Sequence, residues 1–127
     1  MSTAPQVWHY GLVAEYWAEF SHDAPEQEYL QSQIARYGQP VLDLACGVGR
    51  ILVPLLQSGI DIDGCDISPD MLSHCRSRAE RAGLTPRFYQ QTMHEFSLPR
   101  RYKTIYICDS FVLAESREYN QATLNRC

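Results

Sequence analysis

The sequence contains no apolar run close to the ~20 residues that a membrane-spanning helix needs. Its first residues also lack the charged and apolar regions of a secretory signal peptide. The 5 cysteines are odd in number, widely spaced and without a C-x-x-C pair, which argues against a disulfide framework and against a zinc site. We therefore predict no membrane partner, no bound metal and a reducing, cytoplasmic location.

Positive charge is scarce as well, because 11 lysines and arginines face 15 acidic residues and leave a net charge of -4. Proteins that bind nucleic acid usually carry a basic surface, so we do not expect such a partner here. The chain has 127 residues, of which 45% are hydrophobic, and this is enough for one domain with its own core. We predict a single domain over residues 1–127.

The segment Val41–Arg50 reads as a strand, a glycine turn and the start of a helix. Gly47 and Gly49 allow a ligand to approach the backbone closely, and the start of the helix offers free N–H groups. The third glycine of the dinucleotide pattern G-x-G-x-x-G is absent, because its place is taken by Leu52. Asp43 lies inside the apolar strand, where a charge is costly without a partner. A cofactor that carries an ammonium group would supply that partner.

Strand-like and helical segments alternate through the rest of the chain. Two helical segments come first, and Ser68, Pro69 and Asp70 later form a helix start with a serine cap and a proline in the first turn. The expected strands are residues 41–45, 60–65, 87–91 and 104–108, and the later helices are 50–58, 69–82 and 116 onward. This alternation predicts an α/β fold with a parallel sheet and right-handed crossovers.

Polar side chains follow several of these strands, at the sheet edge where open α/β folds bind ligands. Asp66 closes the second strand, and a carboxylate there accepts both hydroxyls of a ribose. After the third strand, Met93 can pack against an aromatic base, and Thr92 or its backbone can hydrogen-bond the edge of that base. His94 is either a proton carrier or a surface histidine that caps a turn. Cys108, at the end of the fourth strand, lies at the same edge.

These motifs resemble those of the class I S-adenosylmethionine-dependent methyltransferases. Motif I of that family is matched by residues 41–50, and its acidic-loop motif is matched by Gly64–Leu72. The resemblance implies S-adenosylmethionine as the cofactor and a Rossmann-like parallel sheet sandwiched by helices. It also implies that Asp43 and the glycine turn hold the amino-acid end of the cofactor, that Asp66 holds its ribose and that Ile67 and Met71 flank its adenine. The implied cofactor-binding residues are Asp43, Ala45, Cys46, Gly47, Gly49, Asp66, Ile67, Met71, Thr92, Met93, His94 and Cys108.

Two positions depart from the family pattern. Ala45 stands where a glycine or another small residue is common, and Thr92 stands where the family often has an aspartate that meets the adenine amino group. A complete domain of this family has seven strands, whereas this sequence supplies about four, in the expected order 3-2-1-4. We expect residues 1–39 to form N-terminal helices or a lid and residues 40–127 to form the cofactor-binding core, with the C-terminal strands absent.

The expected function is S-adenosylmethionine-dependent methyl transfer to a small-molecule acceptor, with this chain supplying mainly the cofactor-binding half. The segment 10–20 is either a lid over the cofactor or a helix that packs into the core. Tyr10, Trp17 and His94 are the candidates for lining the methyl-transfer site. The fourth strand would be an apolar sheet edge, so a homodimer through that strand or the last helix is expected.

Two other functions stay open. The first is a non-catalytic interaction or regulatory protein on a truncated methyltransferase scaffold, which the small number of strands and Thr92 would fit. The second is a nicotinamide-dependent oxidoreductase, and Asp43 and the missing third glycine speak against it.

Overall fold

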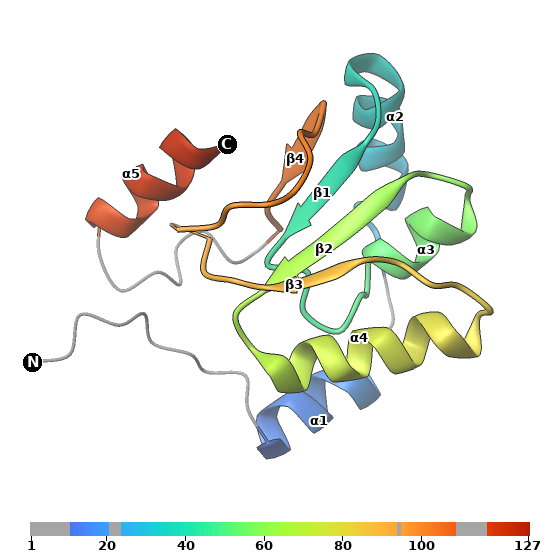
Figure 1. Cartoon of the computed structure of the whole chain (residues 1–127). Coiled ribbons are helices and arrows are strands. Elements are labelled where there is room, and N and C mark those ends of the chain that lie inside the picture. Colours follow the sequence, from blue (N-terminus) through green and yellow to red (C-terminus); the bar gives the residue numbers. More distant parts are fainter. Residues whose placement is uncertain (1–10, 21–23, 94, 109–116) are drawn as a thin grey trace, which may run out of the picture.

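A computed structural model of the chain describes residues 11–20, 24–93, 95–108 and 117–127, and it shows a single sheet with helices around it (Figure 1). Strands and helices alternate in the predicted order. The elements are α1 (Gly11–Phe20), α2 (Gln27–Tyr37), β1 (Val41–Leu44), α3 (Leu52–Gln57), β2 (Ile62–Asp66), α4 (Pro69–Arg81), β3 (Phe88–Gln90), β4 (Thr104–Tyr106) and α5 (Arg117–Arg126).

The four strands are hydrogen-bonded in the order β3-β2-β1-β4, and every pair is parallel. This confirms the predicted α/β fold and strand order. Because the strands are parallel, their carboxyl ends meet at one edge of the sheet. Within the described residues β4 pairs with β1 alone, and dimerisation through its other edge stays a prediction.

Several elements are shorter than predicted, because turns occupy their ends. β1 stops at Leu44, since Ala45 has a φ of 68° and cannot continue a strand. Helix α3 begins at Leu52, two residues later than Arg50, because the glycine turn extends further into the chain. Helix α4 begins as predicted: the Ser68 hydroxyl accepts a hydrogen bond from the Met71 backbone N–H at 3.2 Å.

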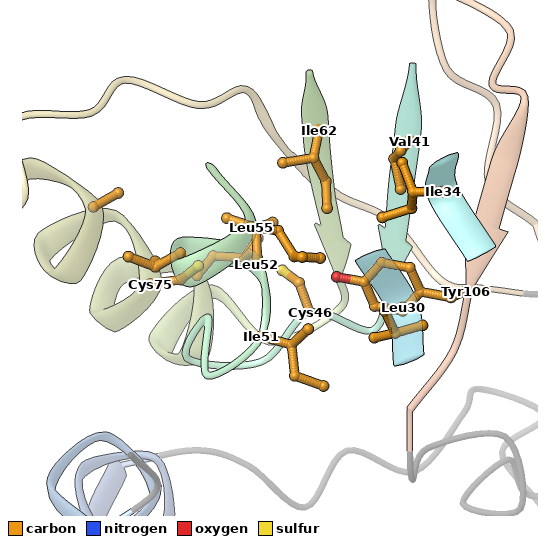
Figure 2. Close-up of a cluster of buried hydrophobic side chains, with 13 residues drawn as sticks. Leu30, Ile34, Val41, Cys46, Ile51, Leu52, Leu55, Ile62, Cys75 and Tyr106 are labelled. Carbon is orange, nitrogen blue, oxygen red and sulfur yellow. The ribbon is translucent and has the colours of Figure 1, made fainter. Parts of the chain in front are cut away.

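Helices α2, α3 and α4 pack on one face of the sheet through the main cluster of buried side chains (Figure 2). Alternation along β1 places Val41 and Asp43 on this face and Leu42 and Leu44 on the other. The residues labelled in the cluster are Leu30, Ile34, Val41, Cys46, Ile51, Leu52, Leu55, Ile62, Cys75 and Tyr106.

The second face of the sheet carries a smaller cluster of Leu42, Leu44, Cys65 and Phe96. Asp63 is buried on β2 and binds two side chains of the segment that connects β3 to β4. Arg100 Nε and the Tyr102 hydroxyl donate to Asp63 Oδ2 at 2.9 and 2.7 Å. A buried carboxylate is costly without such partners. These hydrogen bonds also hold the segment between β3 and β4 against the sheet.

Helix α1 packs against α4 and the glycine turn. The Gly11 N–H donates to Asp70 at 2.6 Å, and buried Ala14 packs against Val48 and Met71. The opposite side of α1 exposes large side chains, namely Leu12, Val13, Tyr16, Trp17 and Phe20. Helix α1 is thus packed through small residues and exposes its aromatic ones, and a role of segment 10–20 as a lid over the cofactor stays a prediction. None of the helices in the described ranges is long and apolar enough to cross a membrane, and the cytoplasmic location stays a prediction.

Candidate functional site

The turn after β1 is built by three residues in the left-handed region of backbone conformation. Their φ values are 68° at Ala45, 58° at Gly47 and 82° at Gly49. The N–H groups of Ala45 and Cys46 donate to the Cys65 carbonyl at 2.7 and 3.0 Å, which ties the turn to β2. Glycine adopts this conformation without a steric penalty, whereas an alanine pays about 1–2 kcal/mol.

The second glycine of the turn is also demanded by packing. A Cβ added to Gly49 would lie 2.6 Å from Cys75 Sγ and 3.0 Å from Val53 Cγ2. At Gly47 the same atom would lie 3.3 Å from Met71 Cε. Helix α4 therefore lies directly against the turn, and its residues help to shape any ligand site there.

Asp66, at the end of β2, joins two turns through its carboxylate. Oδ2 accepts from the Gly47 N–H at 2.9 Å, and Oδ1 accepts from the Ser68 N–H at 2.9 Å. The side chain is half-buried and lies beside the glycine turn, and its binding of a ribose stays a prediction. A carboxylate is an acceptor with two oxygens and about four lone-pair sites, the type of group that binds ligand hydroxyls.

Asp43 is buried on β1, with 3% of its surface exposed. The Tyr106 hydroxyl donates to Asp43 Oδ2 at 2.7 Å. Burial raises the pKa of Asp43 to about 7, although the hydrogen bond from Tyr106 opposes this shift; the nearby Asp66 raises the pKa further and Arg50 lowers it. Burial makes the charged form of this carboxylate costly, so a cation bound next to it would stabilise that form.

The third-strand end contributes an unusual polar atom. Thr92 Oγ1 is buried and has no hydrogen-bond partner within the described part of the chain. Buried hydroxyls are nearly always paired, so a ligand group that donates or accepts there would satisfy it. Met93 packs with the second-face cluster, while Met71 is buried beside Val48 and Ile67 is half-buried. That these residues flank an adenine stays a prediction.

Two cysteines at the site, Cys46 and Cys65, are buried thiols. A hydrogen bond with Cys75, followed by burial, holds the pKa of Cys46 well above its usual value. Burial raises the pKa of Cys65 to about 12. Because the thiolate is the reactive form, neither group is suited to act as a nucleophile. Cys108 follows β4 and is half-buried at the same sheet edge.

Of the three candidates for the methyl-transfer site, the structure describes only Trp17. Trp17 lies on the exposed side of α1, with 41% of its surface accessible. Tyr10 and His94 lie outside the described residues. Within those residues, no group of three histidines, cysteines or acids could hold a metal ion.

The sequence reasoning missed two residues that act on Asp43. Tyr106 lies opposite it in the β1–β4 register, and Arg50 is held by an ion pair with Glu26 at 2.7 Å. The only sequence signal for Tyr106 is that its hydroxyl would need a hydrogen-bond partner inside an apolar strand. Finding that partner requires the order of the strands in the sheet. From the sequence alone, Arg50 is only the first residue of the helix expected over residues 50–58.

Comparison with known proteins now adds to this geometry. A family profile described as "Methyltransferase domain" matches residues 41–127. A putative methyltransferase of Geobacillus sp. is 31% identical over 84% of this chain. The chain belongs to the S-adenosylmethionine-dependent methyltransferase family. The resemblance read from motif I and the acidic loop is thereby confirmed, and with it the expected cofactor class.

Other members of the family extend this result. A putative methyltransferase of Bacillus subtilis is 29% identical over 77% of the chain. The chain spans about half the length of these curated relatives, namely 47% of the Geobacillus protein and 40% of the Bacillus one.

Two solved structures share the fold. The magnesium protoporphyrin IX methyltransferase of Synechocystis, solved with bound S-adenosylmethionine, has a TM-score of 0.65 at 21% identity and covers 89% of this chain and 67% of its own. A protein from Pyrococcus horikoshii has a TM-score of 0.70 at 25% identity, with coverages of 88% and 54%.

Proposed function

We propose that this chain binds S-adenosylmethionine at the carboxyl edge of its sheet and supplies the cofactor-binding half of a methyltransferase that acts on a small-molecule acceptor. The observation that carries the proposal is the buried carboxylate of Asp43 directly behind the glycine turn. A nicotinamide dinucleotide would bring a pyrophosphate and no ammonium group to this carboxylate, which disfavours the oxidoreductase alternative.

The chain's own residues would bind and orient the cofactor. Asp43 would receive its ammonium group, Asp66 its ribose hydroxyls and Thr92 Oγ1 the edge of its adenine. When bound, S-adenosylmethionine supplies a methyl group already activated by the positive sulfonium. The protein therefore needs mainly to position the two reactants and to exclude water, and a catalytic base is optional for an acceptor that is already nucleophilic.

The exposed aromatic side chains of α1 support a small organic acceptor. Tyr16 packs on Phe20 with ring centroids 4.9 Å apart, and Trp17 lies edge-on to Tyr16. The same helix contacts the glycine turn through Ala14. The net charge of -4 fits a polyanionic acceptor poorly. Relatives are divided on this point, because one is named as a ubiquinone biosynthesis O-methyltransferase and another as an RNA methyltransferase.

Isothermal titration of the purified chain with S-adenosylmethionine and with S-adenosylhomocysteine tests the cofactor proposal. We expect micromolar binding that is lost in Asp43→Ala and in Asp66→Ala. Glu80→Gln, an exposed acid on α4, is the matched control and should bind like the parent. No binding at millimolar ligand would contradict the proposal and favour the non-catalytic scaffold.

Transfer of a labelled methyl group tests the acceptor. Hydroxylated aromatic compounds and total RNA should be offered in parallel, with labelled product expected only from the former. Trp17→Ala should lower turnover more than cofactor affinity, since Trp17 lies on the exposed side of α1. Methyl incorporation into RNA alone would overturn the small-molecule assignment.

A further inference from the structure

Tyr106 is a buried tyrosine whose hydroxyl faces the candidate cofactor site from the neighbouring strand. The parallel register of β1 and β4 places Tyr106 directly opposite Asp43. Figure 2 shows its ring reaching from β4 into the buried cluster next to β1. The hydroxyl donates to Asp43 Oδ2 at 2.7 Å, and both residues are at least nine-tenths buried.

The other charged and titratable groups near Asp43 come from the turn after β1 and from β2. Arg50, at the end of the turn, favours the charged carboxylate, but its guanidinium is already bonded to Glu26 at 2.7 Å. Asp66 on β2 disfavours the charged form by repulsion. The Cys46 thiol is held protonated and adds no charge. Within the described residues, Tyr106 is thus the side chain that hydrogen-bonds this carboxylate.

We propose that Tyr106 is a positioning residue for the cofactor, whose hydroxyl keeps the Asp43 carboxylate ionised and aimed so that it can receive the cofactor's ammonium group. The inference rests on the proposed function and deepens it. It gives the fourth strand a part in cofactor binding that no motif reveals. It also predicts that binding is coupled to a proton at Asp43.

The coupling follows from the competing influences on the carboxyl group. Burial raises the pKa of Asp43 to about 7, so the free protein holds a proton there for part of the time at neutral pH. An arriving ammonium group favours the charged form, and the carboxyl proton then leaves for the solvent. Affinity should therefore fall by about tenfold per pH unit once the pH is well below this pKa. Without the Tyr106 hydroxyl the pKa of Asp43 should rise further, because that hydrogen bond favours the charged form.

Isothermal titration of the whole chain with S-adenosylmethionine can measure both effects. Affinity is followed from pH 5.5 to 8.5, and at pH 7 the titration is repeated in two buffers of different ionisation enthalpy, which counts the protons released. The parent should release a fraction of a proton at pH 7. Tyr106→Phe should bind about tenfold more weakly there, release more protons and recover toward parental affinity at high pH. An NMR titration of free S-adenosylmethionine gives the part of the pH dependence that belongs to the ligand's own ammonium group.

Tyr102→Phe is the matched control, because it removes the same hydroxyl from a tyrosine bonded to Asp63 on the other face of the sheet. It should leave the pH profile and the proton count unchanged. Equal weakening of Tyr106→Phe at every pH, with the parental midpoint, would show that the hydroxyl does not act through the protonation of Asp43 and would overturn the inference alone. A parent that binds at no pH would instead overturn the proposed function, and this inference with it.

An NMR titration of the side-chain carboxyl groups in the ligand-free parent tests the inference even if Tyr106→Phe does not fold. The Asp43 signal, assigned by its loss in Asp43→Asn, should titrate near neutral pH. A midpoint at the ordinary value of 3.8 would contradict the predicted coupling of binding to a proton, because Asp43 would then already be fully ionised at neutral pH before the cofactor arrives.

Discussion

The carboxylate of Asp66 accepts the backbone N–H of Gly47 at 2.9 Å, so the acid at the end of β2 holds the glycine turn that follows β1. Its other oxygen accepts the N–H of Ser68, the residue that caps α4. A single side chain thereby fixes the relative positions of the glycine turn and of the start of α4, the two segments that we propose to bind the cofactor. Such preorganisation reduces the ordering cost of binding.

Asp66→Asn should weaken cofactor binding by tenfold or more and lower stability by only about 1–2 kcal/mol. The amide keeps one oxygen acceptor, but its NH₂ group would face a backbone N–H that needs an acceptor. Calorimetric titration and urea unfolding of the same preparation separate the two effects. Unchanged affinity in this variant would show that Asp66 serves the two turns alone.

Gly49→Ala should destabilise the fold by about 2–4 kcal/mol, because the new Cβ would lie 2.6 Å from Cys75 Sγ. Gly83→Ala is the matched control: its φ of 75° carries a similar backbone penalty, but nothing lies within 4 Å of its Cβ. We expect about 1 kcal/mol for the control in urea unfolding. Adding Cys75→Ala to Gly49→Ala should recover part of the loss, and equal losses in the two glycine variants would refute the packing argument.

These two glycines show what could be predicted from the sequence and what could not. Positive φ at a turn is a local property, so the glycine turn and the strand–helix alternation were predictable. The contact between Gly49 and Cys75 joins residues far apart in the chain, and it depends on how α4 packs on the sheet. The Tyr106–Asp43 hydrogen bond depends in the same way on the β1–β4 register, which becomes known only when the strands are assembled.

Ala45→Gly should stabilise the fold by about 1 kcal/mol, since Ala45 has a φ of 68° and a Cβ that this conformation disfavours. The greater freedom of glycine in the unfolded chain offsets part of the gain. Ala79→Gly, in the buried face of α4, is the control and should lose stability. Thermal unfolding checks both variants. A loss in Ala45→Gly would mean that the alanine methyl group contributes more by packing than it costs in strain.

Asp43→Asn should be more stable than the parent at pH 8 and lose the cofactor. The pKa of Asp43 is raised to about 7 in the folded protein from an ordinary value of 3.8. Between these pH values the folded state keeps a proton that the unfolded state has released, so the contribution of Asp43 to stability falls as the pH rises. An asparagine has no such titration, and the advantage of the variant should reach up to about 4 kcal/mol above pH 7.

Urea unfolding at pH 5 and pH 8 measures this advantage, which should be smaller at the lower pH. Asp61→Asn is the control of opposite sign, because its hydrogen bond with Arg100 lowers the pKa of Asp61. That carboxylate contributes stability above its unfolded pKa, so the control variant should lose stability at both pH values. An Asp43→Asn variant that is less stable than the parent at pH 8 would show that the buried charge is already compensated in the free protein. The stability retained by the parent would then come from Tyr106 and Arg50, and the gain expected from an arriving ammonium group would be correspondingly smaller.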